Sequence, residues 1–192
     1  QNLKAINDIN LSIIKLDQSD INNFNDFEKK IEDASIDIIF NCAGDFGGSF
    51  EEQEVENIDF NKFQKVLMVN SISILNIIKI ILNKKKNKSK LELIINISGM
   101  AGSIYHNEDG NAYIYRTSKS ALNSITKNLS IDLNKKFGTT VFAIHPGNTK
   151  SAMNPGGYIE GDNCAKLIID LITTKSELNG KFVNLLGEEI FW

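Results

Sequence analysis

The stretch SIDIIFNCAG, residues 35–44, is a run of apolar and β-branched residues that ends in polar and small ones. Two later stretches have the same pattern, LIINISGMAG at 93–102 and VFAIHPG at 141–147. Nearly continuous apolar runs of this length are typical of strands buried on both faces of a parallel sheet. We therefore expect neighbouring strands whose carboxyl ends open at one edge, where ligands of such sheets bind.

Helical patterns separate these strands, which predicts the α/β fold class with a mostly parallel sheet covered on both faces. The helical segments lie near 20–33, 58–83, 113–136 and 161–176, and further β-type runs lie at 11–17 and 181–186. The 192 residues suit one domain that extends over 1–192.

Composition excludes several classes of function. The net charge is −3 and Arg116 is the single arginine, so we expect no binding to nucleic acid or to a membrane surface. Cys42, Cys164, His106 and His145 are isolated in the sequence, which predicts free thiols and no metal site. The first residues lack the apolar core of a secretory signal, so we expect a cytoplasmic protein.

The segment VLMVNSISILNIIKIIL, residues 66–82, is apolar on nearly all sides of a helix. Its longest oily stretch, 72–82, is too short for a bilayer and contains Lys79. Such a helix needs cover on more than one side. A homodimer through helices 58–83 and 113–136 would supply this cover, and so would the interior of a larger single domain.

The segment NAYIYRTSKSALN, residues 111–123, holds Tyr115 four residues before Lys119. On a helix these side chains share one face. A tyrosine has an ordinary pKa of about 10, and a neighbouring ammonium favours the phenolate. The pair therefore predicts a general acid or base, whereas Tyr113 has Thr117 at the equivalent spacing and cannot repeat the arrangement.

Three other polar or small residues accompany the pair. Gly44 allows a close approach of backbone to a ligand, and Asn41 is either part of that turn or a structural hydrogen bonder. Asn70 lies in a strongly apolar helix, where its amide needs a partner.

In order along the chain, Asn41-Cys42-Ala43-Gly44, Asn70, Tyr115-x-x-x-Lys119 and Pro146-Gly147 resemble the motifs of the short-chain dehydrogenase/reductase family. Within it, the segments 102–123 and 179–192 are similar to the C-factor and sniffer-type carbonyl reductases. The resemblance covers essentially the whole chain. It implies a Rossmann-like, doubly wound parallel sheet and hydride transfer between NADP(H), favoured over NAD(H), and a small carbonyl or alcohol substrate.

The resemblance also implies roles for single residues. Tyr115 would protonate the carbonyl oxygen, Lys119 would lower the pKa of Tyr115 and bind the nicotinamide ribose, and Asn70 would hold a water. The remaining cofactor contacts would come from Asp17, Asn41, Ala43 and Gly44 on the adenosine side and from Pro146, Gly147, Thr149 and Ser151 on the nicotinamide side. Loops 103–112 and 152–162 would shape the substrate pocket.

The chain departs from the family pattern in two places. Aligned on Gly102, the position of the catalytic serine holds Gly99, and Ser98 or Ser103 would have to replace its hydroxyl. The family's Gly-rich phosphate turn does not occur in the sequence, and residues 1–17 resemble the approach to the family's third strand, so the first strand, first helix and second strand are missing. This predicts an N-terminally truncated sheet, which a truncated sequence, a differently completed sheet or a degenerate family member would explain. Segment 11–17 would then lack a neighbour, and strand 35–41 would expose its edge.

The resemblance and the two departures from it lead to two main hypotheses for the function. The first is an NAD(P)-dependent reductase. The alternative is a catalytically impaired pseudoenzyme or interaction module of the same family that lacks the phosphate-binding loop, and a relative that binds another nucleotide-like ligand is a third reading.

Overall fold

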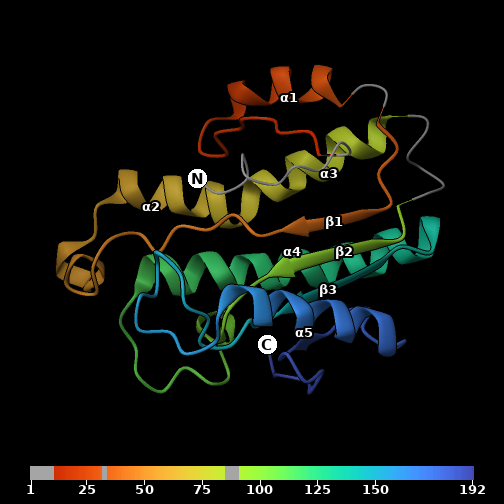
Figure 1. Cartoon of the computed structure of the whole chain (residues 1–192). Coiled ribbons are helices and arrows are strands. Elements are labelled where there is room, and N and C mark those ends of the chain that lie inside the picture. Colours follow the sequence, from red (N-terminus) through yellow and green to blue (C-terminus); the bar gives the residue numbers. More distant parts are fainter. Residues whose placement is uncertain (1–10, 32–33, 85–90) are drawn as a thin grey trace.

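The computed structural model describes residues 11–31, 34–84 and 91–192. Its centre is a parallel sheet in the order β1-β2-β3-β4 (Figure 1). The strands are β1 (Ile38–Asn41), β2 (Leu93–Ile97), β3 (Thr140–Ile144) and β4 (Phe182–Val183). In the register, Asn41 lies beside Asn96, and Ile97 lies beside Ile144, so the carboxyl ends of three strands meet at one edge. The predicted α/β class with a parallel sheet is confirmed.

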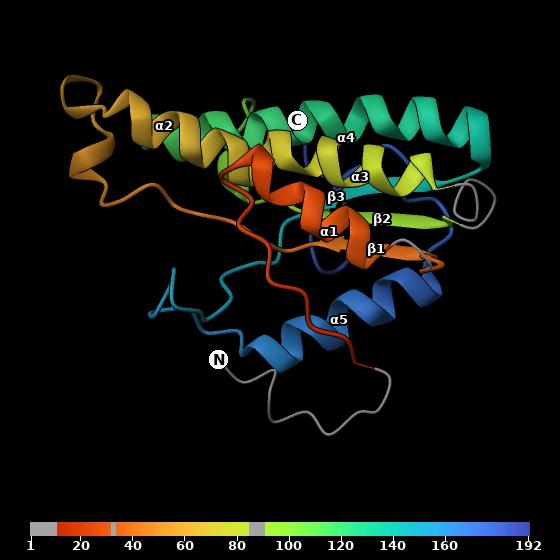
Figure 2. The same ribbon diagram turned by 90° about the horizontal axis from the view of Figure 1, so that it is seen from above.

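Helices cover the two faces of the sheet (Figure 2). The helices are α1 (Phe24–Lys30), α2 (Phe60–Leu67), α3 (Ser73–Asn83), α4 (Tyr113–Phe137) and α5 (Gly161–Thr174). Residues from α1, α3, α4 and alternate strand positions such as Ile94 and Val141 form one apolar core. The intervening positions, Ile95 and Phe142 among them, pack with α5 in a second core. The apolar runs lack alternation because the central strands are buried on both faces.

The predicted helix at 58–83 is one continuous but irregular helix. A π-helical turn, Met68–Ile72, joins α2 to α3. The whole segment Phe60–Asn83 has 24 residues and is long and apolar enough to cross a membrane, by length and composition alone. It is therefore longer than the oily stretch 72–82 suggested. Its apolar residues Ile74, Ile77, Ile78 and Ile81 are buried in the core against the sheet, which is the arrangement of a core helix in a globular protein.

The prediction of a strand at 11–17 is wrong. This segment forms neither helix nor strand and joins no sheet. Ile14 and Leu16 instead pack against the first core, while Leu11 and Ile13 are exposed. A strand requires a neighbouring strand for its backbone hydrogen bonds, and among the described residues the sheet contains only β1, β2, β3 and β4. Burial still alternates along the segment, because Ile14 and Leu16 pack against the first core while Lys15 between them is exposed.

The prediction that the strand at 35–41 exposes its edge is confirmed. Within the described residues β1 pairs only with β2. The side chains of Ile38 and Phe40 are 48% and 42% exposed, whereas Ile39 between them is buried. The face of β1 on the α5 side is thus left open, because α5 covers the positions contributed by β2 and β3.

Candidate active site

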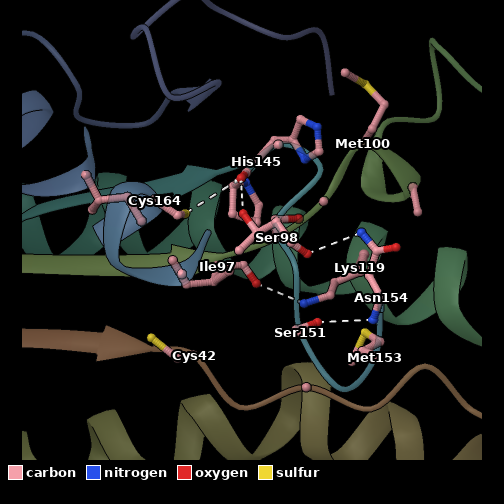
Figure 3. A pocket seen from close by; sticks show the side chains of 18 of the residues that line it. Cys42, Ile97, Ser98, Met100, Lys119, His145, Ser151, Met153, Asn154 and Cys164 are labelled. Carbon is pink, nitrogen blue, oxygen red and sulfur yellow. Dashed lines mark hydrogen bonds between the residues drawn. The ribbon is translucent and has the colours of Figure 1, made fainter. Parts of the chain in front are cut away.

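A cavity of about 680 Å³ opens at the carboxyl edge of the sheet. Its walls come from five segments: the turn at Cys42 and Gly44, the loop Ser98–Ala101, the first turns of α4, the loop that follows β3, and the first half of α5. Figure 3 shows Lys119 reaching from α4 into this cavity, with Met100 and His145 on one side and Ser151 and Met153 on another. The sequence predicted this meeting of loops from the parallel strand order.

Tyr115 and Lys119 both line the cavity from one face of α4. The Nζ of Lys119 lies 5.7 Å from the centroid of the Tyr115 ring. The same Nζ donates a hydrogen bond of 2.8 Å to the carbonyl oxygen of Ile97, the last residue of β2. The ammonium is therefore anchored to the sheet and held beside the tyrosine.

Burial governs the proton affinity of both groups. It raises the pKa of Tyr115 above 10.0 and lowers the pKa of Lys119 from 10.5 to about 8. We expected Lys119 to lower the pKa of Tyr115, and the structure gives the opposite direction because desolvation of the phenolate dominates. At neutral pH the phenol is thus protonated and Lys119 is charged.

Gly99 lies next to the tyrosine. Its backbone is extended, with φ of −171° and ψ of 161°, a conformation that any residue adopts. A Cβ added there would meet, among the described residues, one heavy atom within 4 Å, the Tyr115 Oη at 3.6 Å. Position 99 therefore faces the catalytic candidate and has room for a side chain.

The two serines considered as replacements are engaged elsewhere. The Ser98 hydroxyl is buried and donates to Asn123 Oδ1 at 2.7 Å. The Ser103 hydroxyl donates to the carbonyl oxygen of Phe191 and fastens the C-terminal segment. The Ser98 hydroxyl is therefore committed to Asn123 on α4, although atoms of Ser98 also line the cavity.

Asn70 lies in the π-helical turn and is fully buried. Its Oδ1 accepts from the backbone N–H of Asp45 at 2.8 Å, and its Nδ2 donates to the Asp45 carbonyl oxygen and to Ser118 Oγ, each at 2.8 Å. Both amide hydrogens are committed, so the side chain clamps the loop after Gly44 onto α4. The hydrogen-bond partner that the sequence predicted for the Asn70 amide is therefore the backbone of this loop, at Asp45.

The residues predicted for the adenosine side do not converge on the cavity. Asn41 donates to Asn96 Oδ1 at 2.6 Å, and Asn96 donates to Thr126 Oγ1 at 2.8 Å, so Asn41 is a structural hydrogen bonder between sheet and α4. Asp17 is exposed and accepts from the N–H and hydroxyl of Ser19, which lowers its pKa. Ala43 is exposed, and among these residues only Gly44 lines the cavity.

The residues predicted for the nicotinamide side do converge. Pro146, Gly147, Thr149 and Ser151 all line the cavity. Thr149 Oγ1 donates to the carbonyl oxygen of Pro146 at 2.6 Å and thereby closes the turn. Ser151 exchanges two backbone hydrogen bonds of 3.1 Å with Asn154 and holds the next turn of the loop.

His145 was missed as a site residue because no metal-binding partner accompanies it in the sequence. It lines the cavity directly before Pro146, and burial lowers its pKa. Among the described residues, its buried Nδ1 has no hydrogen-bond partner. The sequence signal that could have identified His145 was its position at the carboxyl end of an apolar strand, where the site was expected.

These features fit the nicotinamide and ribose half of a dinucleotide. Lys119 supplies a buried donor, Gly44 keeps the opposite wall thin, and the unpartnered Nδ1 of His145 offers a polar contact. Cys42 and Cys164, both free thiols, also line this space. Buried polar atoms in a largely apolar cavity are the usual means of orienting a ligand.

Known proteins share this fold and are similar in sequence. A sequence model of the family described as short chain dehydrogenase matches residues 1–157. C-signal of Myxococcus xanthus is 26% identical over 159 residues, which cover 82% of this chain and 93% of that protein. The carbonyl reductase Sniffer of D. melanogaster is 30% identical, with a TM-score of 0.84 over 98% of this chain and 81% of its own. The NADPH-bound carbonyl reductase from chicken fatty liver is 26% identical, with a TM-score of 0.77 over 95% and 78%.

The buried charge of Lys119 predicts a stability cost. The fall in its pKa from 10.5 to about 8 penalises the charged form by about 3 kcal/mol. Lys119→Met removes this penalty and also the hydrogen bond to Ile97, so we expect it to raise the free energy of unfolding at pH 7 by about 1–2 kcal/mol. Chemical denaturation measures this difference.

The pH dependence has a definite sign. Between pH 8 and 10.5 the unfolded chain keeps a proton on Lys119 that the folded chain has lost, so wild-type stability rises with pH in this window. The advantage of Lys119→Met should shrink there. Lys127→Met is the control, because Lys127 also donates to a carbonyl oxygen, that of Gly180 at 3.2 Å, but is exposed. A destabilised Lys119→Met at pH 7 would contradict the argument.

Proposed function

The chain belongs to the short-chain dehydrogenase family, and we propose that it reduces the carbonyl group of a small ketone or aldehyde with NADPH. One observation carries the proposal: Tyr115 and Lys119 line one cavity from one helix face, with the ammonium 5.7 Å from the ring. The relatives whose names describe carbonyl reductases support the reaction type. The choice of NADPH over NADH is supported by the chicken enzyme, whose description names bound NADPH.

Tyr115 is the general acid in this proposal. Burial raises its pKa, so the phenol is protonated at neutral pH and donates to the carbonyl oxygen as negative charge develops there. The reverse reaction requires the phenolate, so alcohol oxidation should need alkaline pH. The charged Lys119 stabilises negative charge on the Tyr115 oxygen after the transfer.

The cofactor would be held by Gly44, Lys119, Pro146, Gly147, Thr149 and Ser151, which line one cavity. When bound, NADPH supplies the hydride. His145 offers its Nδ1 to a polar group of the ligand. Contacts of Asp17, Asn41 and Ala43 with the adenosine half, and of Asn70 with a water, stay predictions, and the committed Asn41 amide supports a structural role for that residue.

The substrate proposed is small and uncharged, because the space beyond Tyr115 is walled by Met100, Ala101 and Met153. We further propose a cytoplasmic homodimer. Ile72 and Leu75 of the 58–83 helix and Ile131 of α4 leave 40%, 43% and 57% of their surfaces exposed. Apolar surface of this kind is a common feature of protein interfaces. Light scattering that gives the mass of one chain would exclude the dimer.

Tyr115→Phe tests the reaction. Loss of the acid should lower kcat for carbonyl reduction by about 10²–10⁴-fold, measured as NADPH oxidation in the presence of small ketones and aldehydes. Tyr113→Phe is the matched control, because Tyr113 lies on the same helical turn but is 46% exposed. Equal activity of Tyr115→Phe and wild type would exclude Tyr115 as the acid.

One observation favours the second candidate, a catalytically impaired relative. Position 99 faces the Tyr115 oxygen but carries no hydroxyl. Gly99→Ser adds a donor where the backbone is already extended and the space is open, and we expect kcat to rise about ten- to a hundredfold. Gly99→Ala is the control, since it fills the same space without a donor. If Gly99→Ser binds NADPH but neither variant nor wild type turns over, the chain is a non-catalytic relative.

A further inference from the structure

The helix that carries the catalytic pair begins without a cap of its own. Ala112 precedes the first turn of α4 with φ of 47° and ψ of 40°, and Asn111 before it also has a positive φ of 52°. The first N–H groups of a helix need acceptors, which a Ser, Thr, Asp or Asn normally supplies from the position of Ala112. Alanine has no side-chain acceptor, so another residue must take this role.

Gln53 takes it from 62 residues away. Its Oε1 accepts a hydrogen bond of 2.9 Å from the backbone N–H of Tyr115. Tyr115 is the third residue of α4, the position to which a local cap side chain usually reaches. Gln53 is fully buried, and its Nε2 donates to the carbonyl oxygen of Phe46 at 2.9 Å. Both ends of its amide are therefore used.

The same contact ties a loop to Tyr115. The loop that leaves Gly44 is clamped at Asp45 by Asn70. Its next residue, Phe46, places its ring 4.9 Å from the Tyr115 ring at an interplanar angle of 49°. Gly47, at φ of +89°, approaches α4 so closely that an added Cβ would lie 3.0 Å from Ile114 Cγ2. Gln53 closes this loop onto the helix.

We propose that Gln53 is a positioning residue for the reaction: it caps α4 from outside the helix and fixes both the backbone and the ring of Tyr115. The inference rests on the proposed function, since Gln53 acts through the general acid. It also links the cavity wall at Gly44 to Tyr115 through Phe46. Loss of the cap loosens the first turn of α4 and moves the phenol, and displacements of about 1 Å at a reacting group cost rate steeply.

Three variants isolate this role. Gln53→Met keeps the length of the side chain but removes the acceptor, and we expect kcat to fall about tenfold or more while KM stays within about twofold. Gln53→Glu keeps an acceptor for Tyr115 N–H, and its protonated form also keeps a donor for Phe46, so its kcat relative to wild type should recover as pH falls. Asp59→Ala is the matched control, because Asp59 caps α2 through Asn61 and Lys62 N–H at 2.8 and 3.2 Å. We expect it to lower thermal stability to a similar extent and leave kcat unchanged.

Hydrogen exchange gives a readout that does not depend on turnover. Gln53→Met should speed exchange of the Tyr115 amide about tenfold, and Asp59→Ala should not change it. Unchanged exchange in Gln53→Met would overturn the cap. A kcat loss as large in Asp59→Ala as in Gln53→Met would overturn the positioning role, because general destabilisation would explain both. Absence of turnover in wild type would reject the proposed function, while the exchange result would still decide the cap.

Discussion

A row of buried hydrogen bonds fixes α4 on the sheet, and the rest of the site depends on this register. Successive turns of α4 pair with Asn70 through Ser118, with the Ile97 carbonyl through Lys119, with Ser98 through Asn123, and with Asn96 through Thr126. Apolar contacts are not directional and would allow the helix to slide. A slip by one turn would leave these groups buried without partners, at about 1–3 kcal/mol for each. The row therefore delivers Tyr115 and Lys119 to the carboxyl edge of the strands.

The row also explains why polar residues interrupt otherwise apolar segments. Asn96 lies in the middle of a buried strand, where an unpaired amide would be costly, yet it accepts from Asn41 and donates to Thr126. Asn70 plays the corresponding role between the π-helical turn, α4 and the loop after Gly44. The Asn96 and Asn70 amides thus hold the sheet, the loop after Gly44 and α4 at fixed positions relative to one another. Such pre-organisation is what a proton transfer requires, since the donor must already be in place.

The sequence predicted most elements because each leaves a local signal. The strands β1 to β3 follow from continuous apolar runs, and α4 ends at Phe137, where Gly138 with φ of 75° forms the left-handed C-cap that glycine favours. Segment 11–17 has the composition of a strand, and the missing family strands predicted that it would lack a neighbour; among the described residues it has no ladder partner and forms no strand. Tyr115 and Lys119 share a face through fixed helical spacing, whereas their pKa values depend on burial. The role of Gln53 could not be predicted either, because its hydrogen-bond partner, the Tyr115 N–H, is 62 residues away in the sequence.

Several unfavourable features gather at this one edge of the sheet. Lys119 is buried with a lowered pKa, Asn111 and Ala112 adopt left-handed conformations, and Nδ1 of His145 is the buried side-chain atom without a partner among the described residues. Structural packing alone gives no reason for these costs, because each could be removed by a commoner residue or conformation. Strain and buried charge that persist together at a cavity are typical of functional sites. The positive φ values have a specific consequence: they turn the chain into α4 where Ala112 cannot cap it, which leaves the Tyr115 N–H free for Gln53. The left-handed residues before α4 and the cap from Gln53 therefore act together, and both determine the position of Tyr115.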